Sequence, residues 1–399
     1  MAADPEDRET GSAPARLDPA AHYAELRAQC PMAWQASARS WLATTYEANH
    51  AGLRVPRTSH TGILGPWLAL RDRYGFDFPS SIRVIAAMPF NYEGAEHARL
   101  RRLAAQSVMP FAERTELFAE VARRLLEKPL RDGRMDFAAD FSNRLLFEVL
   151  ADLCYLAPAD REALYPLSRF SWAIEATLSM RDRKTMDDAV GNAFELLSDR
   201  APGIIARHPD SLFAVLHRLM PEDEPDPVGM AVTMLCVFLL MGNDALGGVM
   251  ASGVAWLLDP ARNGGRTVPQ ARWPEIADDL LRHGAPIDFL SRVFHAPATV
   301  GGVDLEPGDS VMFSPLAANR DPARFGADAD DISLDHRAGV GLTFGAGRHL
   351  CVGMAMSRSV VATALAVLAE APPLRLSGPI VPGRGSIIRT IASMPVEFV

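Results

Sequence analysis

The sequence predicts a mainly α-helical protein with a minor β component, on three observations. Apolar residues recur at three- and four-residue spacing in most segments before Gly284, as they do along one helix face. One of these segments, which begins at Asp226, is long enough to cross a whole domain. After Gly284, β-branched residues and turn glycines become frequent, which is typical of short strands.

Five of the segments before Gly284 carry one apolar face each. They are 93–107, 110–127, 143–156, 187–207 and 273–283. The longest predicted helix has Asp226 as its N-cap and Pro227 at its first position, and it runs to about Asp259. At 1.5 Å per residue its length is roughly 50 Å, so we expect it to be the central element of the fold.

The predicted elements after Gly284 are shorter. We expect strands within 291–300 and 302–312, a loop over 318–341, a glycine-rich stretch over 344–353 and a helix to about Ala371. Pro372 and Pro373 end that helix because proline lacks a backbone donor and clashes with the preceding turn. The tail, 387–399, predicts a pair of strands.

Composition excludes several classes of protein. The chain has 399 residues, a net charge of −9 and 48% hydrophobic residues, so it can bury a large core but lacks the basic surface that nucleic acids require. Its longest apolar run, 228–242, is shorter than the ~18–20 residues of a membrane span. Residues 1–16 are polar and are expected to be disordered, with no signal peptide. Four widely separated cysteines suit a reducing cytoplasm and disfavour a zinc site or a disulfide framework.

One cysteine stands in an unusual setting. Residues 344–353 read FGAGRHLCVG, with three glycines around Cys351 directly before a predicted helix. Backbone N–H groups at a helix N-terminus would lower the pKa of this thiol, and a thiolate can serve as an axial ligand of iron. The alternative is an ordinary buried cysteine that follows a glycine turn.

The loop resembles the signature of the cytochrome P450 superfamily, F-G-x-G-x-H-x-C-x-G. The match is complete and comprises Phe344, Gly345, Gly347, His349, Cys351 and Gly353. The resemblance implies a single domain over 17–399 that binds haem b between the long helix and the cysteine loop. It makes Cys351 the iron ligand, places Phe344 against it, and assigns His349 to a haem propionate.

Three further positions match the propionate-binding residues of this family. His97 and Arg101 lie at i,i+4 on one helix, and Arg292 follows Pro286 by six residues. Arginine is well suited to pair with the two carboxylates of haem. Each basic residue taken alone could equally be a solvated surface charge.

Two departures from the family pattern are visible. The usual E-x-x-R is Asp279-x-x-Arg282 here, and the third partner of that network is His336 in place of arginine. We expect these three residues to form a structural ion-pair network.

The second departure is in the long helix. The family's A-G-x-[D/E]-T aligns with Met241, Gly242, Asn243, Asp244 and Ala245, so the threonine hydroxyl of the proton path is missing. The resemblance assigns Gly242, Asn243, Asp244 and Ala245 to the catalytic region. Either a water or substrate group replaces the hydroxyl in a hydroxylase, or the chemistry is altered towards coupling, ring formation or desaturation.

The resemblance also predicts the substrate pocket. Its walls would be Val237, Leu240, Met241, Ile287, Asp288, Ile387 and Ile388, with 80–88 as the roof. Asp288 is the one charged member. It either faces the pocket and a polar substrate group or bonds a neighbouring backbone N–H.

The favoured function is oxidation of a small or medium organic molecule, in secondary metabolism, with O2 and electrons from a ferredoxin and its reductase. Four arginines would flank the ferredoxin site, namely Arg99, Arg102, Arg348 and Arg358. The alternatives are a peroxide-driven or isomerising haem enzyme, and a haem-binding protein without turnover.

Overall fold

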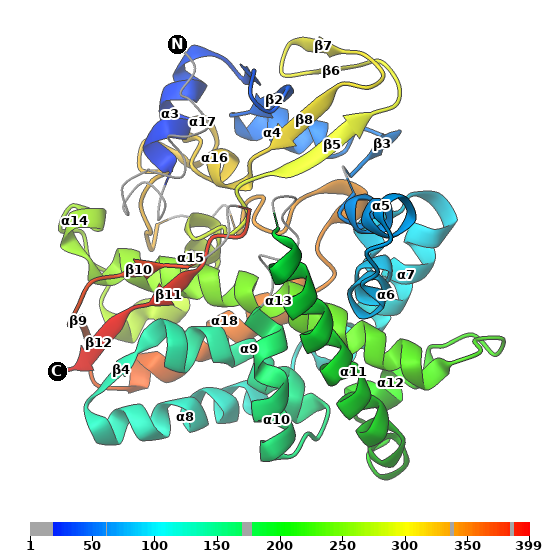
Figure 1. Ribbon diagram of the computed structural model, residues 1–399. Coiled ribbons are helices and arrows are strands. Elements are labelled where there is room, and N and C mark those ends of the chain that lie inside the picture. The colour runs from blue at the N-terminus through cyan, green and yellow to red at the C-terminus, as the bar shows by residue number, and fades with distance from the viewer. Residues whose placement is uncertain (1–18, 61, 170–177, 336–338, 384–386) are drawn as a thin grey trace.

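The computed structural model describes residues 19–60, 62–169, 178–335, 339–383 and 387–399. Helices gather around α13 (Pro227–Leu258), which runs through the middle of the molecule, and a small sheet covers one end (Figure 1). The mainly α fold with a minor β component is therefore confirmed. The predictions for residues 1–16 and for His336 lie outside the described residues.

The long central helix begins and ends where the sequence predicts. The Asp226 side chain accepts a hydrogen bond from the backbone N–H of Gly229, Pro227 holds the first helical position, and the helix ends at Leu258. By length and hydropathy it is the one helix in the described residues that could cross a membrane, although 67% of its most apolar 18-residue window is buried inside the protein. Burial of that kind is typical of a core helix.

The other helices with predicted counterparts differ mainly at their ends. They are α7 (Gly94–Val108), α8 (Thr115–Asp132), α9 (Asn143–Leu153), α11 (Met180–Arg207), α15 (Ala277–His283) and α18 (Met354–Glu370). The predicted start of α8 is too early because Met109–Phe111 forms a separate 3-10 turn. The predicted helix over 273–283 is also divided, since the 3-10 segment Gln270–Ile276 precedes α15.

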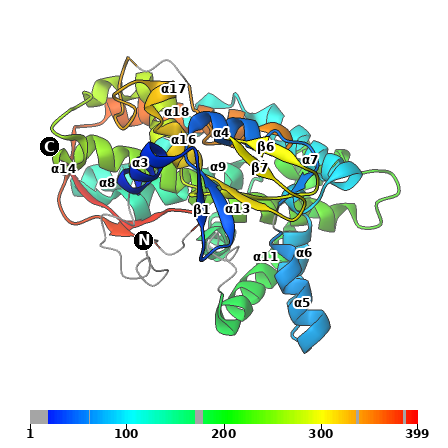
Figure 2. The same ribbon diagram turned by 90° about the horizontal axis from the view of Figure 1, so that it is seen from above.

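The remaining helices are short or lie near the chain start. They are α3 (Ala20–Gln29), α4 (Tyr46–Gly52), α5 (Leu64–Tyr74), α6 (Pro79–Ala86), α10 (Pro158–Leu164), α12 (Leu212–Arg218), α14 (Pro260–Asn263), α16 (Pro315–Asn319) and α17 (Pro322–Phe325). The last two interrupt the loop predicted over 318–341. Seen from above, α5, α6 and α11 project together from the main body (Figure 2).

In the part of the chain that the structure describes, the strands form four small sheets. The largest has the order β1-β2-β8-β5-β3, in which β2 and β8 are parallel and the other pairs antiparallel. The others are β6-β7, β10-β11 and β4-β12-β9. The strands are β1 (Met32–Gln35), β2 (Ser40–Ala43), β3 (Thr58–Ser59), β4 (Arg134–Asp136), β5 (Leu290–Phe294), β6 (Ala298–Val300), β7 (Val303–Leu305), β8 (Ser310–Phe313), β9 (Leu374–Leu376), β10 (Val381–Pro382), β11 (Ile391–Ser393) and β12 (Pro395–Phe398).

The C-terminal tail contains the two strands that the sequence predicts, but they do not pair with each other. Strand β11 pairs with β10, and β12 lies between β4 and β9. Only Met394 separates β11 from β12. A hairpin turn needs at least two residues, so the chain passes directly from one sheet to the other.

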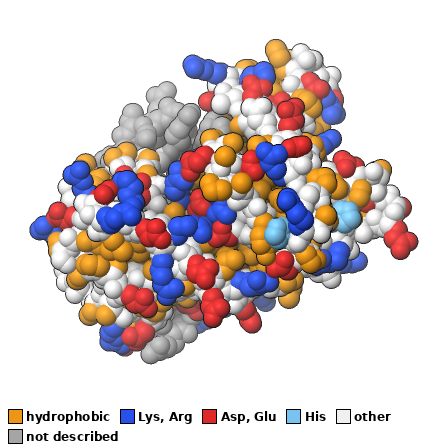
Figure 3. Space-filling model, turned by 90° about the horizontal axis from the view of Figure 1, so that it is seen from below, with side chains coloured by type: hydrophobic (Ala, Val, Ile, Leu, Met, Phe, Trp, Pro, Cys, Tyr) orange, Lys and Arg blue, Asp and Glu red, His pale blue; other side chains and the backbone are white. Residues whose placement is uncertain are grey.

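On the face shown in Figure 3, basic and acidic side chains are intermingled over the surface. Most of the apolar core lies beneath this surface between α13 and the helices α9, α11 and α15.

Candidate active site

A cavity of about 740 Å³ lies beside α13 and contains the residues of the cysteine loop. Its walls come from α7, α13, β5, the loop before α18 and the turn at Ile387 and Ile388. These elements are up to about 290 residues apart in the sequence, so only the tertiary fold brings them together.

The cysteine loop is held in a tight backbone conformation. The N–H of Cys351 donates to the carbonyl of Phe344 at 2.9 Å, which closes the loop around a short 3-10 turn, Gly347–His349. Gly347 has a φ of +70°, and a Cβ there would lie 2.5 Å from the carbonyl oxygen of Leu53. Glycine is therefore required at this position, and the closed loop places Cys351 just before α18.

The accessible surface of Cys351 faces the cavity, since this residue is one of the cavity's lining groups. Surrounding protein removes the thiol from bulk water, and this burial raises its pKa; the Gly353 N–H and the charge of Arg101 oppose the rise. The expected lowering of the pKa is thus wrong for the polypeptide alone, because desolvation outweighs the helix N-terminus. Coordination to a metal cation deprotonates a thiol outright.

Four of the predicted cofactor-binding side chains meet in this cavity. Arg101 donates to the carbonyl oxygen of Leu350 at 2.6 Å, and Arg292 donates to that of Ser291 at 2.8 Å. The rings of His97 and His349 lie 4.5 Å apart between centroids. His349 Nε2 also contacts Glu93 Oε1 at 3.0 Å, which orients its ring.

The charges of these groups fit a ligand with carboxylates. His97 Nε2 is buried and has no hydrogen-bond partner among the described residues, and burial lowers the pKa of Arg292 to about 10. Burial, together with the nearby Arg292 guanidinium and His349 ring, also lowers the pKa of His60 to about 3. No aspartate or glutamate lines the cavity among the described residues. Two propionates would supply the negative charge that these residues lack. His60 was missed by the sequence reasoning, because it lies in a loop with no distinguishing pattern.

The α13 wall of the cavity is wholly apolar. Its members are Val237, Phe238, Met241, Gly242, Ala245, Leu246 and Val249. Ala245 therefore lies where predicted, with no hydroxyl to offer. A Cβ on Gly242 would lie 2.9 Å from Leu146 Cδ2, so this glycine also allows α9 to pack closely against α13. Leu240 is fully buried but does not line the cavity, so its prediction as a pocket residue is wrong.

Asn243 and Asp244 point away from the cavity. The Asn243 amide accepts from the N–H of Phe147 at 3.0 Å and donates to the carbonyl oxygen of Asn143 at 2.6 Å. The Asn243 side chain therefore holds α9 against α13. The assignment of Asn243 to the catalytic region is not supported. Asp244 is buried and forms an ion pair with Arg169, whose side chain is partly exposed.

The 287–288 and 387–388 segments meet at the cavity. Ile287 and Ile388 form a β-bridge, and both line the cavity together with Ile387. Asp288 does not line it. Its carboxylate pairs with Arg389, Oδ1 to Nε 2.9 Å, so of the two uses expected for Asp288 the structure does not support the one that faces the pocket. From the predicted roof over 80–88 only Met88 lines the cavity, because α6 turns its other residues elsewhere.

The residues of the D-x-x-R motif are structural, as expected. Arg282 Nε donates to Asp279 Oδ1 at 2.5 Å, and Arg282 Nη1 donates to the carbonyl oxygens of Asn319 and Ala329. The pair is buried outside the cavity, and it ties α15 to the loop that leads towards Cys351.

No protein-family model matches the chain. Among curated proteins it is 26% identical over 392 residues to "Vitamin D(3) 25-hydroxylase" of Pseudonocardia autotrophica, which covers 94% of this chain and 93% of the relative. It is 24% identical over 366 residues to "Putative cytochrome P450 123" of Mycobacterium tuberculosis, with 88% and 86% coverage.

Solved structures have the same fold. The structure of CalO2 matches with a TM-score of 0.81 at 23% identity, over 100% of this chain and 99% of that one. A complex of P450BioI with an acyl carrier protein also matches with a TM-score of 0.81, at 21% identity, over 96% and 100%. The chain thus has the fold of solved cytochrome P450 structures, and it is similar along nearly its whole length to curated cytochrome P450 oxidoreductases, whose cysteine-loop signature it carries complete.

Proposed function

We propose that the protein is a cytoplasmic haem-thiolate monooxygenase that acts on a small or medium organic molecule in secondary metabolism. Haem b would be its cofactor, and a ferredoxin with its reductase would supply electrons. The observation that carries this proposal is the Cys351 thiol in a cavity that has buried cations and no carboxylate among its described lining residues. A relative that is 25% identical, from Micromonospora griseorubida, is named "Mycinamicin IV hydroxylase/epoxidase", which supports the substrate class.

Different residues would bind the iron and the propionates of the cofactor. Cys351 would bind the iron, while His97, Arg101, Arg292 and His349 would bind the two propionates. When bound, haem with a thiolate ligand activates O2 for transfer of an oxygen atom to an organic substrate. The apolar residues of α13 and the 387–388 turn would exclude water and hold the substrate against the cofactor.

Proton delivery must differ from the usual arrangement. Asp244 holds its carboxylate against Arg169, outside the cavity, and Ala245 cannot relay a proton from it. Since no other α13 residue on the cavity wall has a polar side chain, the donor on the α13 side of the cavity would be a water or a polar group of the substrate. Two kinds of reaction meet this condition. One is hydroxylation in which the substrate helps to supply the proton, and the other is oxidative coupling, cyclisation or desaturation.

The test of the haem-thiolate proposal is the variant Cys351→Ala. It should abolish the thiolate-type spectrum of the reduced protein with carbon monoxide. Cys236→Ala is the matched control, because Cys236 is a fully buried core residue whose pKa is raised to about 12 by burial. A thiolate-type spectrum that survives in Cys351→Ala would exclude Cys351 as the ligand.

Electron donors separate the proposal from its alternatives. Turnover of a bound ligand should require NADH, ferredoxin reductase and ferredoxin. Turnover with hydrogen peroxide alone would favour a peroxide-driven enzyme, and turnover without any donor an isomerising one. Haem and ligand binding without product under all three conditions would favour a binding protein.

A further inference from the structure

His60 lines the cavity but is not one of the four residues assigned above to the propionates. It directly follows β3, which pairs with β5 in an antiparallel register that sets Ser59 opposite Val293. The next two residues along this register are His60 and Arg292. Directly opposite residues in an antiparallel pair present their side chains to the same face, and both of these side chains line the cavity. His60 is therefore a neighbour of Arg292.

The contacts of the His60 ring determine its tautomer. Its Nδ1 atom accepts a hydrogen bond from the backbone N–H of Gly62 at 3.3 Å, so the proton of the neutral ring must be on Nε2. Burial, with Arg292 and His349 nearby, lowers the pKa of His60 to about 3, which keeps the ring neutral at pH 7. His60 thus has one N–H donor, and no described residue accepts a hydrogen bond from it.

Neighbouring groups hold the His60 ring in place. Its centroid lies 5.3 Å from that of Phe90, and both rings line the cavity. Phe90 belongs to a 3-10 turn in which Asn91 Oδ1 accepts the backbone N–H groups of Ile63 and Leu64. This turn therefore contacts the ring and also binds the chain just after it, so the donor has a defined position before any ligand binds.

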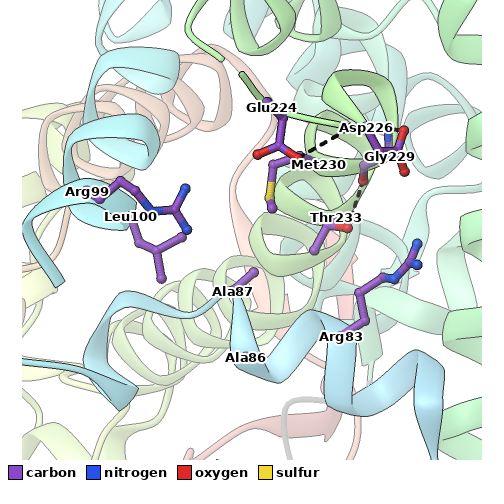
Figure 4. Close-up of a pocket in the computed structure, with 10 residues that line it drawn as sticks. All are labelled: Arg83, Ala86, Ala87, Arg99, Leu100, Glu224, Asp226, Gly229, Met230 and Thr233. Atoms are coloured by element: carbon purple, nitrogen blue, oxygen red, sulfur yellow. Dashed lines mark hydrogen bonds between the residues drawn. The ribbon is translucent and has the colours of Figure 1, made fainter. Parts of the chain in front are cut away.

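The cavity lacks an anionic group that could accept this hydrogen bond. A second pocket, of about 270 Å³ between α6, α7 and the start of α13, is lined by two arginines and two carboxylates, namely Arg83, Arg99, Glu224 and Asp226 (Figure 4). That pocket contains charges of both signs without a ligand. In the cavity beside Cys351, by contrast, no described lining residue is acidic. An N–H donor next to Arg292 would therefore be matched by an anionic ligand.

We propose that His60 is a further haem-binding residue, whose Nε2–H donates to the propionate that Arg292 also binds. This inference rests on the proposed function, because the propionate belongs to the proposed cofactor. A neutral N–H donor and a guanidinium would then hold one carboxylate from two adjacent strands. Since the ring already has its tautomer and its position, little further ordering would oppose the contact.

The test compares haem with its dimethyl ester, in which both propionates are uncharged. The loaded protein is mixed with excess apomyoglobin, and the rate at which each group leaves is measured. His60→Phe keeps a ring beside Phe90 but has no N–H donor. It should lose haem roughly 10- to 100-fold faster than wild type, the scale of one hydrogen bond to a charged group, and lose the ester at a rate within about 3-fold of wild type.

Two further variants identify the donor as the cause. His60→Gln offers an amide N–H and should recover most of the haem retention that His60→Phe loses. His295→Phe is the matched control, because His295 is bound to the same strand pair, with Nε2 2.8 Å from Ser59 Oγ, but is exposed and does not line the cavity. It should release both groups at wild-type rates.

The reduction potential of the haem is a second readout. Without the His60 donor the negative charge of the propionate is less compensated, which favours ferric iron. The potential of His60→Phe should therefore be lower than that of wild type and of His295→Phe.

Equal acceleration of haem and ester release in His60→Phe, or wild-type release rates in that variant, would overturn the proposal. If His60→Phe does not fold, His60→Ala decides by the same comparison, because a smaller side chain introduces no clash. The carbon monoxide spectrum would be recorded for every protein. A thiolate-type spectrum alongside either overturning result would reject the His60 contact and leave the haem-thiolate function intact.

Discussion

Asp288 and Arg389 form an ion pair beside the cavity, with Oδ1 and Nε 2.9 Å apart and both side chains largely buried. The backbone N–H of Arg389 donates to the carbonyl oxygen of Pro286 at 2.7 Å, and its side chain donates to that of Ala285. The pair thus ties the segment after α15 to the C-terminal turn. Both segments supply cavity walls, through Ile287 and Ile388.

We expect Asp288→Ala to destabilise the protein by about 1–3 kcal/mol, because it leaves the Arg389 cation in a buried position without this partner. Urea unfolding of the haem-loaded protein measures the change. Glu397→Ala is the control, since its pair with Arg375 is exposed and should contribute no more than about 1 kcal/mol. Unchanged stability in Asp288→Ala, together with a large loss of ligand affinity, would instead support a role for Asp288 in substrate binding.

Ala245→Thr tests the source of protons. It restores a hydroxyl on the cavity wall, next to the bulky Met241. If the substrate supplies the missing donor, the variant should change coupled turnover little, or reduce it by crowding. Product formed per NADH consumed is the measurement, with Ala245→Val as the control for size. A large gain in coupling for the threonine variant alone would show an impaired ordinary hydroxylase.

The proposed ferredoxin site depends on fewer free charges than the sequence suggested. Arg99 pairs with Glu96, Arg348 with Glu93 and Arg358 with Asp278, which leaves Arg102 exposed and without an ion pair to a described residue. Arg102→Glu should therefore slow reduction by an acidic ferredoxin most strongly at low salt. Stopped-flow reduction at two ionic strengths measures this, with Arg207→Glu at the far end of α11 as the control. Identical reduction rates for both variants would show that ferredoxin does not bind at Arg102.

His60 should make the haem-stripped protein sensitive to acid. Its folded-state pKa of about 3 lies below the ordinary 6.5, so the unfolded chain takes up a proton first as the pH falls. Its contribution to stability is complete above pH 6.5 and falls by about 1.4 kcal/mol per pH unit towards pH 3. Urea unfolding at pH 7 and pH 5 measures how much unfolding free energy is lost on acidification. The loss should be smaller in His60→Gln than in wild type, and unchanged in His22→Gln, where the histidine is exposed. Bound propionates should weaken the effect. Equal losses in wild type and His60→Gln would contradict it.

The sequence by itself determined the elements whose signals are local. The N-cap Asp226, Pro227 and the apolar run of α13 lie within one segment, and the cap and the helix hydrogen bonds form between residues close in the chain. The same holds for the cysteine loop, since the spacing of Gly347 and Cys351 already implies a tight turn before a helix.

Tertiary structure alone decided which of these side chains meet. Whether Leu240 or Met241 faces the cavity depends on where neighbouring helices pack around α13, which an almost wholly apolar helix does not reveal. Asn243 contacts a helix 100 residues away, and Asp288 pairs with a residue 101 positions later. His60 and Arg292 come together only because β3 pairs with β5. Burial and charge pairing across such separations depend on the packed structure as a whole, because each buried polar group is satisfied by whichever partner the fold brings to it.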